Sequence, residues 1–165
     1  MRHIKLLLIS VVVFMLILFG MSLLFPSTVV ISRAVDISAN ANEVYKKLDN
    51  CIAWKSWVTQ LNDSSLRNFT ATKIHSDKLD VTITAVQSDK IMSKWKVVNG
   101  NLQESTMRII SASSMPNAIT VQWQFEEHIN WYQPWEKFAS LVGDQVLGTM
   151  MENNLNNLKK QVEIN

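Results

Sequence analysis

The sequence predicts an α+β fold in which one N-terminal transmembrane helix precedes an antiparallel sheet and a long C-terminal helix. Three observations carry this prediction. A run of twenty residues without a charge occupies Leu6–Phe25. Between Leu66 and Ile129, apolar and polar residues alternate in successive short segments, as in strands with one wet face. From Pro134 onward, apolar residues instead recur at steps of three and four, the period of an amphipathic helix.

The uncharged run Leu6–Phe25 is long enough to cross a bilayer. Twenty residues at about 1.5 Å each span about 30 Å, the thickness of the hydrocarbon core. A cleaved signal peptide is the first alternative, with Gly20-Met21-Ser22 as its cleavage site, but the apolar run continues past that point. A buried core helix is the second. The retained anchor and the cleaved signal both export the domain.

The charges around this run predict its orientation. Arg2, His3 and Lys5 come before it, and no acidic residue occurs before Asp36. By the positive-inside rule, the N-terminus is cytoplasmic and the rest of the chain lies on the extracytoplasmic (periplasmic or envelope) side. We therefore expect a single-pass membrane protein with an anchor at residues 1–25 and one domain at residues 26–165.

A strand and two short helices should follow the anchor. Pro26 ends the first helix, and apolar residues alternate with polar ones over Thr28–Ile37, which predicts a strand. Asn40 is followed three positions later by Glu43, the pattern of a helix N-terminus, so we expect a helix up to Leu48. A second helical turn is expected over 52–57.

Between residues 66 and 129 the pattern predicts strands joined by short turns. Asn99-Gly100-Asn101 is a strong hairpin signal, because Asn-Gly readily adopts the positive φ of a type I′ turn. Met115-Pro116-Asn117 predicts the next turn, and the polar stretch 62–65 predicts a loop. The expected strands are Leu79–Ala85, Lys90–Val98, Leu102–Ser111 and Ala118–Ile129.

The last element should be a helix over Pro134–Val162, since proline suits the first turn of a helix. Gly143 and Gly148 lie inside it. Each glycine costs about 1 kcal/mol relative to alanine in a helix interior. We therefore expect either a bend or close packing against the sheet at these positions.

Charge and cysteine content exclude several classes of function. Arg2 and Lys5 are two of the sixteen basic residues, and the other fourteen balance the fourteen acidic ones. A domain without surplus positive charge lacks the basic face that nucleic acid requires, so we exclude nucleic-acid binding. Cys51 is the one cysteine, so no intramolecular disulfide can form, and we expect it to be inert packing.

Histidines and glycines are too scattered to predict a metal, cofactor or nucleotide site. No His-x-x-x-His or Cys-x-x-Cys spacing occurs, and no catalytic residue is assigned. Glu127 is the carboxylate of interest, because alternation places it on the side of Trp123 and Phe125, whereas Glu126 and His128 should face water. Glu127 either lies in a cavity mouth, where desolvation would suit acid–base work, or lies beyond the covered part of the sheet.

Aromatic residues should form either core or cavity. Trp54 and Trp57 are expected to close one end of the core. Trp95, Trp123, Trp135 and Phe138 would line a ligand cavity between the sheet and the long helix, or would simply fill the core. The sequence alone leaves both alternatives open.

Four segments together resemble the START-like (SRPBCC) superfamily, and within it the membrane-anchored polyketide cyclase/dehydrase and lipid-transport group. They are Phe25-Pro26-Ser27 leading into Val29–Ile37, the helix Asn40–Leu48, the pair in Trp54-Lys55-Ser56-Trp57, and the terminal stretch Met150–Val162. The likeness covers nearly the whole chain from Pro26. It implies a helix-grip fold, in which a curved sheet wraps the last helix and encloses an apolar ligand.

We therefore expect binding of a hydrophobic small molecule or lipid, oriented by a polar group such as Glu127 or Arg108. The alternatives are a cyclase- or hydrolase-type enzyme that uses Glu127 in the same cavity, and an envelope scaffold domain with a filled core. The expected partners are the membrane and the ligand, and the sequence identifies no protein partner. The expected ligand-binding residues are Trp95, Trp123, Phe125, Glu127, Trp135, Phe138, Val142 and Met150.

Overall fold

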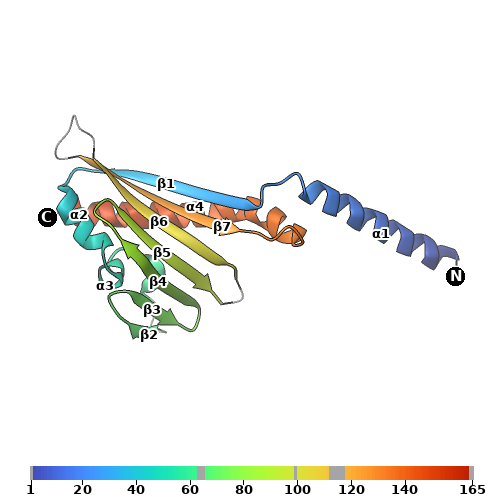
Figure 1. The fold of residues 1–165 in the computed structure, drawn as a ribbon, viewed down its shortest axis with the longest axis horizontal. Coiled ribbons are helices and arrows are strands. Elements are labelled where there is room, and N and C mark those ends of the chain that lie inside the picture. Colours follow the sequence, from blue (N-terminus) through green and yellow to red (C-terminus); the bar gives the residue numbers. More distant parts are fainter. Residues whose placement is uncertain (1, 63–65, 99, 112–117, 164–165) are drawn as a thin grey trace.

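The computed structural model describes residues 2–62, 66–98, 100–111 and 118–163. Helix α1 (Arg2–Ser22) projects from one end of the domain, and its stretch His3–Ser22 is the one described helix that is long and apolar enough to cross a membrane (Figure 1). The predicted turns around Asn99 and at 115–117, and most of the loop at 62–65, lie outside the described residues.

A seven-stranded antiparallel sheet forms the body of the domain, in the order β1-β7-β6-β5-β4-β3-β2. The predicted strands Leu102–Ser111 (β6) and Ala118–Ile129 (β7, observed as Ile119–His128) pair without a register shift, from Gln103 opposite Glu127 to Ser111 opposite Ile119. The strands are β1 (Thr28–Ile37), β2 (Leu66–Phe69), β3 (Lys73–Ser76), β4 (Leu79–Val86), β5 (Lys90–Val97), β6 (Leu102–Ser111) and β7 (Ile119–His128).

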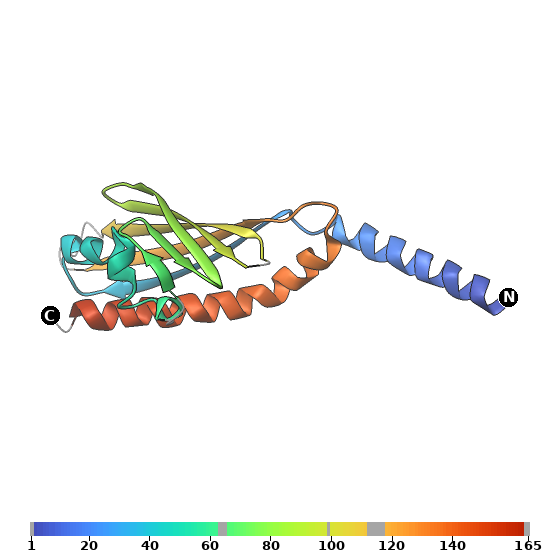
Figure 2. The same cartoon turned by 90° about the horizontal axis from the view of Figure 1, so that it is seen from below.

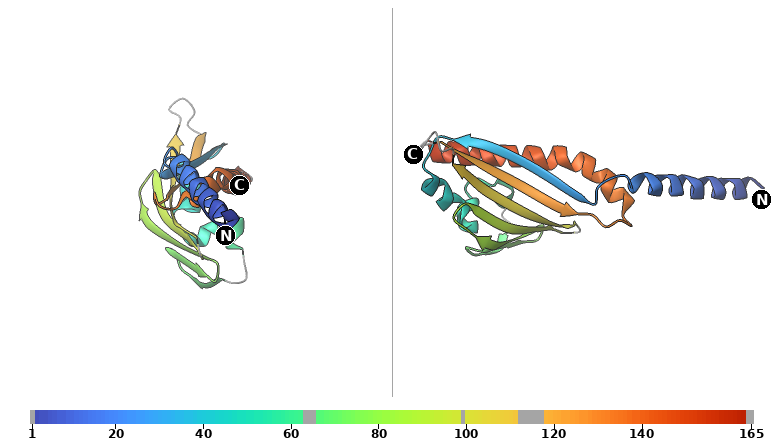
Figure 3. Two further views of the ribbon diagram at one scale, coloured as in Figure 1. Left: turned by 90° about the vertical axis from the view of Figure 1, so that its right-hand side faces the viewer. Right: turned by 45° about the horizontal axis from the view of Figure 1, so that its top comes forward.

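Helix α4 (Pro134–Glu163) runs along one face of this sheet, and Figure 2 shows that it curves in the half nearer α1. It lies beside β1, as both views in Figure 3 show, and the end-on view shows the sheet curving around the helix. At Gly148, an added Cβ would lie 2.2 Å from Arg33 Nη2. The predicted close packing therefore occurs there, with an arginine of β1 laid across the helix.

Asparagine caps begin the two short α-helices, α2 (Ala41–Leu48) and α3 (Cys51–Trp54). Asn40 Oδ1 accepts from the backbone N–H of Asn42 at 2.9 Å, and Asn50 Oδ1 accepts from that of Ala53 at 2.8 Å. The cap predicted at Asn40 is confirmed. The second helix begins one residue earlier and ends three residues before the predicted Trp57, and a 3-10 turn, η1 (Thr59–Leu61), follows it.

Five aromatic rings form the centre of the core, on the side of the sheet that faces α3 and α4. Their centroids lie 5.3 to 6.4 Å from those of their neighbours, and each residue is at most 3% exposed. We call this set the aromatic core: Trp54, Trp57, Trp95, Trp123 and Phe125.

Each buried indole N–H of the aromatic core has an acceptor. Trp54 and Trp57 donate to the backbone carbonyls of Leu48 and Lys47 at 2.8 and 3.0 Å, which also satisfies the end of α2. Trp95 donates to Ser93 Oγ at 3.0 Å, and Trp123 donates to Ser105 Oγ at 2.7 Å. Trp54 of α3 and Trp57, which follows it, thus close one end of the core, as predicted.

Candidate functional site

A pocket of about 480 Å³ lies between the sheet and α4, and its lining comes from the start of β1, the end of β7 and the first part of α4. We call it the sheet–helix pocket. Four adjacent strands, β1, β7, β6 and β5, contribute lining residues, and in the first three Val29 pairs with Glu127, Ile31 with Phe125, and Gln103 with Glu127. The lining residues are Val29, Ile31, Gln60, Val97, Gln103, Phe125, Glu127, Ser140, Gly143, Val146, Leu147 and Met150.

Most of the described lining of the sheet–helix pocket is apolar, and Glu127 is its one titratable side chain. Phe125 and Glu127 are two apart on β7 and therefore point to the same face. The backbone alternation that buries Phe125 at 2% exposure leaves Glu127 half-buried at the end of the strand. The pocket thus has an apolar body and one acidic position.

Amide side chains hold the carboxylate of Glu127. Gln103 Nε2 donates to its Oε2 at 2.9 Å, and Asn101 Nδ2 donates to its Oε1 at 2.8 Å. Asn101 Nδ2 also donates to Glu136 Oε2 at 2.7 Å, and Gln133 Nε2 donates to Glu136 Oε1 at 2.7 Å. This network ties the β5–β6 turn, β7 and the first turn of α4 into one acidic rim at the pocket.

Gly143 widens the sheet–helix pocket on its helix side. An added Cβ there would have nothing within 4 Å, although the residue lines the pocket. A larger side chain at this position would therefore extend into the open volume. The two glycines of α4 thus have different surroundings, since Gly148 faces Arg33 and Gly143 faces empty space.

The structure brings three of the eight predicted ligand-binding residues together in this pocket, namely Phe125, Glu127 and Met150. Trp95 and Trp123 are 3% and 0% exposed, in the aromatic core behind the pocket. Their role in ligand contact stays a prediction.

The remaining predicted ligand-binding residues lie on α4. Trp135 and Phe138 lie near its start, on the side of α1, where they line a separate apolar groove. The side chain of Val142 lies outside the described part of the chain.

Arg108 lies on the other face of the sheet from Glu127. It pairs with Gln122 of β7 and Lys90 of β5 and is exposed, whereas Glu127 pairs with Gln103. Even-numbered residues of β6 and odd-numbered residues of β7 point to opposite faces in this register. Of the two placements that the sequence leaves open for Arg108, beside Glu127 or facing water, the structure shows the second, and the amides of Gln103 and Asn101 lie beside Glu127 instead.

Several lining residues were absent from the prediction. Val29 and Ile31 carry the alternation of the first strand, and Leu147 and Gly143 belong to α4, so each had a local signal. Strand alternation and helix periodicity predict which side chains point toward the interior, but they do not predict which of those side chains contact one another. The partnership of Asn101 with Glu127 had no local signal, because it joins positions 26 residues apart.

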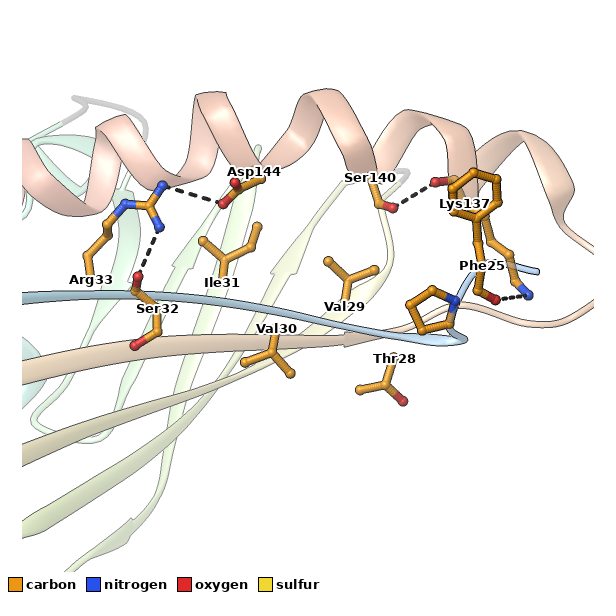
Figure 4. A pocket seen from close by; sticks show the side chains of 11 residues that line it. Phe25, Thr28, Val29, Val30, Ile31, Ser32, Arg33, Lys137, Ser140 and Asp144 are labelled. Atoms are coloured by element: carbon orange, nitrogen blue, oxygen red, sulfur yellow. Dashed lines mark hydrogen bonds and ion pairs between the residues drawn. The ribbon is translucent and has the colours of Figure 1, made fainter. Parts of the chain in front are cut away.

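A second hollow of about 530 Å³ lies on the opposite side of the β1–α4 contact, and three residues, Val29, Ile31 and Ser140, line both hollows. We call this second hollow the β1 groove. Figure 4 shows that its two cationic side chains, Arg33 and Lys137, bind neighbouring groups of the protein. Arg33 donates from Nε to Glu152 Oε1 at 2.7 Å and from Nη1 to the carbonyl of Ser32 at 2.9 Å. Its guanidinium is therefore already bound within the protein.

Lys137 lies at the other end of the β1 groove and is 3% exposed. Its Nζ donates to the carbonyls of Ser22 at 3.3 Å and Phe25 at 3.2 Å, at the end of α1. Because carbonyls at a helix end lack intrahelical donors, this ammonium satisfies them and fixes α4 to the end of α1.

Metal and thiol chemistry find no support in the described residues. No group of three or more His, Cys, Asp or Glu side chains there lies close enough to hold a metal ion. Burial raises the pKa of the Cys51 thiol to about 11, and a backbone hydrogen bond at Ile83 offsets this only in part. Cys51 is thus a buried, protonated thiol that packs in the core.

No protein-family model and no curated protein match this chain. Solved structures do match it. A protein from Nitrosospira multiformis is 9% identical with a TM-score of 0.63, and the match covers 81% of this chain and 96% of that one. A START superfamily protein from Mycobacterium smegmatis is 12% identical with a TM-score of 0.55, covering 81% and 97%.

An aromatase/cyclase-type protein gives a further match. The di-domain ARO/CYC protein BexL of the BE-7585A biosynthetic pathway is 14% identical with a TM-score of 0.60. That match covers 83% of this chain and 50% of the other. At these identities the comparisons show a shared fold, and this chain has the START-like helix-grip fold.

Proposed function

We propose that this chain binds a hydrophobic small molecule or a lipid in the sheet–helix pocket, at the surface of a membrane that α1 crosses. The observation that carries the proposal is the pocket itself, whose body is apolar and whose rim holds one carboxylate. Its volume of about 480 Å³ falls within the roughly 300–1,000 Å³ typical of ligand sites. The START-like fold supports the same class of function.

The lining predicts the chemistry of the ligand. Burial of apolar surface at about 25 cal/mol per Å² supplies the affinity. Glu127 keeps acceptor capacity beside its two amide partners, since a carboxylate has about four lone-pair positions. A ligand with an apolar body and a hydrogen-bond-donating end, such as a hydroxyl or an ammonium group, therefore suits this pocket better than one with a phosphate end.

The tether places the pocket close to a source of such ligands. Helix α1 ends at Ser22 and β1 begins at Thr28, so the connection is short. The basic residues before α1 favour a cytoplasmic N-terminus, which places the domain on the extracytoplasmic side. The proposed binding cycle is passive, and the ligand exchanges between the bilayer surface and a pocket that offers both apolar contact and the Glu127 carboxylate.

Native mass spectrometry of the full-length protein, released from detergent micelles, tests the proposal. We expect a stoichiometric apolar adduct, identified after organic extraction. Gly143→Leu should reduce its occupancy at least about tenfold, because the new side chain fills the pocket, and tenfold corresponds to about 1.4 kcal/mol. Ala139→Leu, on an exposed position of the same helix, is the matched control and should keep the adduct.

Two outcomes would contradict the proposal. One is an adduct-free mass that stays unchanged after incubation with a total lipid extract. The other is an adduct that Gly143→Leu leaves in place, because such a ligand would be held elsewhere on the protein. Either result would favour the alternative function, in which the domain is a scaffold.

A further inference from the structure

Three large aromatic side chains are exposed where β7 leads into α4. Trp131, Tyr132 and Trp135 are 63%, 56% and 65% exposed, whereas the four other tryptophans are at most 3% exposed. The stretch from Ile129 to Trp135 carries no charged residue. We call these three residues the aromatic docking surface. A cluster of exposed aromatic rings marks a surface that contacts another protein or a membrane.

The aromatic docking surface lies beside the end of α1. The rings of Phe19 and Trp131 meet edge to face at 6.1 Å, and those of Phe25 and Phe138 at 5.3 Å. Phe19 is three residues before the end of α1 at Ser22, which corresponds to about 4.5 Å along the helix axis. Trp131 therefore lies beside the last turn of the apolar helix.

A groove of about 720 Å³ opens between α1 and the start of α4. Apart from the hydroxyl of Tyr132 and the indole N–H of Trp135, the side chains of its described lining are apolar. Hydrocarbon fills such a groove favourably, whereas water inside it would lack polar partners. The lining residues are Val11, Val12, Met15, Leu16, Leu18, Phe19, Tyr132, Pro134, Trp135 and Phe138.

We propose that the aromatic docking surface is a second membrane contact, whose partner is the interface of the lipid bilayer itself. Trp and Tyr rings favour the headgroup level, where one edge is apolar and the other is wet. When α1 spans the membrane, its contact with Trp131 places these rings at that level and the groove among the acyl chains. Lipid is thus the occupant that accounts for the exposed rings and the groove together.

This contact orients the ligand pocket. Glu136 follows Trp135 directly and shares Asn101 with Glu127 of the pocket rim. Lys137 fixes the same turn of α4 to the end of α1. The rim of the sheet–helix pocket is therefore held at the bilayer surface. The inference rests on the proposed membrane placement of α1 and not on the identity of the ligand.

Site-specific fluorescence in liposomes tests the second contact in the full-length protein. Three single variants, Leu8→Cys, Tyr132→Cys and Val86→Cys, each carry a bimane label, and the liposomes contain spin-labelled phosphatidylcholine as quencher. All three positions are exposed, and Val86 lies at the end of β4 far from α1. The native Cys51 is buried and protonated, so it should stay unlabelled.

We expect strong quenching at position 8 and at least about threefold more quenching at position 132 than at position 86, as for a surface seated about 5–10 Å into the interface. If position 8 is quenched but positions 132 and 86 are quenched equally, the second contact is overturned while the membrane tether stands. A protein partner would then be the candidate that covers the rings. No quenching at 8 would overturn the membrane placement of α1 and this contact with it. The same label at Trp135→Cys repeats the test on α4.

Discussion

Under the proposed function, the Glu127 carboxylate is the residue on which ligand selectivity would depend. We predict that Glu127→Gln weakens binding of a ligand with a donor end about tenfold or more, because a hydrogen bond to a charged group contributes about 1.5–3 kcal/mol. Fold stability should change little, since the new amide can still accept from Asn101 with its oxygen, while the amide of Gln103 can turn to accept from its NH2 group. Ligand titration followed by native mass spectrometry measures the effect.

Glu126→Gln is the matched control for this substitution. Glu126 lies next to Glu127 on β7 but is exposed, as predicted from strand alternation. Equal loss of binding in both variants would mean that overall charge, not the pocket rim, determines affinity. Glu127→Gln also separates binding from catalysis, because an enzyme that used Glu127 as its base would keep its substrate and lose turnover.

The buried thiol of Cys51 predicts a pH dependence of stability. Burial raises its pKa from 9.0 to about 11. Below pH 9 both states keep the thiol protonated, so this contribution is fully present. Between pH 9 and 11 the unfolded chain ionises while the folded chain does not, so stability falls by about 3 kcal/mol as pH rises.

Thermal unfolding at pH 8 and pH 10.5 measures this contribution. Lysines and tyrosines also titrate in this range, so the difference between the wild type and Cys51→Ala isolates the thiol. We expect the wild type to lose more stability than Cys51→Ala over the interval. Parallel losses in the two proteins would show that the thiol has an ordinary pKa in the folded state.

At the scale of elements, the two glycines of α4 predict different gains in stability from the same substitution. Gly143→Ala should stabilise the protein by about 1 kcal/mol, because alanine is the better helix former and its Cβ meets open space. Gly148→Ala should gain less. Its Cβ would displace the guanidinium of Arg33 and its ion pair with Glu152, a partly exposed contact that contributes about 0–1 kcal/mol.

A double-mutant cycle checks this explanation. In the Arg33→Ala background, Gly148→Ala should give the full gain of about 1 kcal/mol, because the obstructing side chain is gone. The free energy of unfolding of the four proteins provides the measurement. If Gly148→Ala has the same effect with and without Arg33, the close approach between β1 and α4 is not what limits that position.

At the scale of the whole molecule, the basic residues before α1 predict the topology. Helix α4 ends at Glu163, at the end of the domain away from α1. A C-terminal alkaline phosphatase fusion should therefore be active, and a C-terminal green fluorescent protein fusion dark, because the former folds outside the cytoplasm and the latter inside. The double substitution Arg2→Glu and Lys5→Glu should reduce this asymmetry. The reverse reporter pattern in the unaltered protein would contradict the orientation.

Much of the fold is predictable from local pattern. The length of the uncharged run, the alternation along β1, β4 and β7, the cap at Asn40 and the period of α4 each depend on neighbouring residues alone. The short strands β2 and β3 were not separately predicted, because four-residue strands offer too few positions for a period to appear. β3 joins the sheet by pairing with β4, and β2 joins it by pairing with β3.

For the candidate site, the sequence and the tertiary structure supply different kinds of information. By itself the sequence predicted which residues face inward, and Phe125, Glu127 and Met150 of the predicted set line the sheet–helix pocket, while their contact with a ligand stays a prediction. Only the tertiary structure decided that Trp123 packs in the core while Trp135 lies exposed beside α1, although both are apolar rings at the expected spacing. The physical reason is that periodicity fixes the face of a side chain, whereas its neighbours depend on strand register and on the placement of α4.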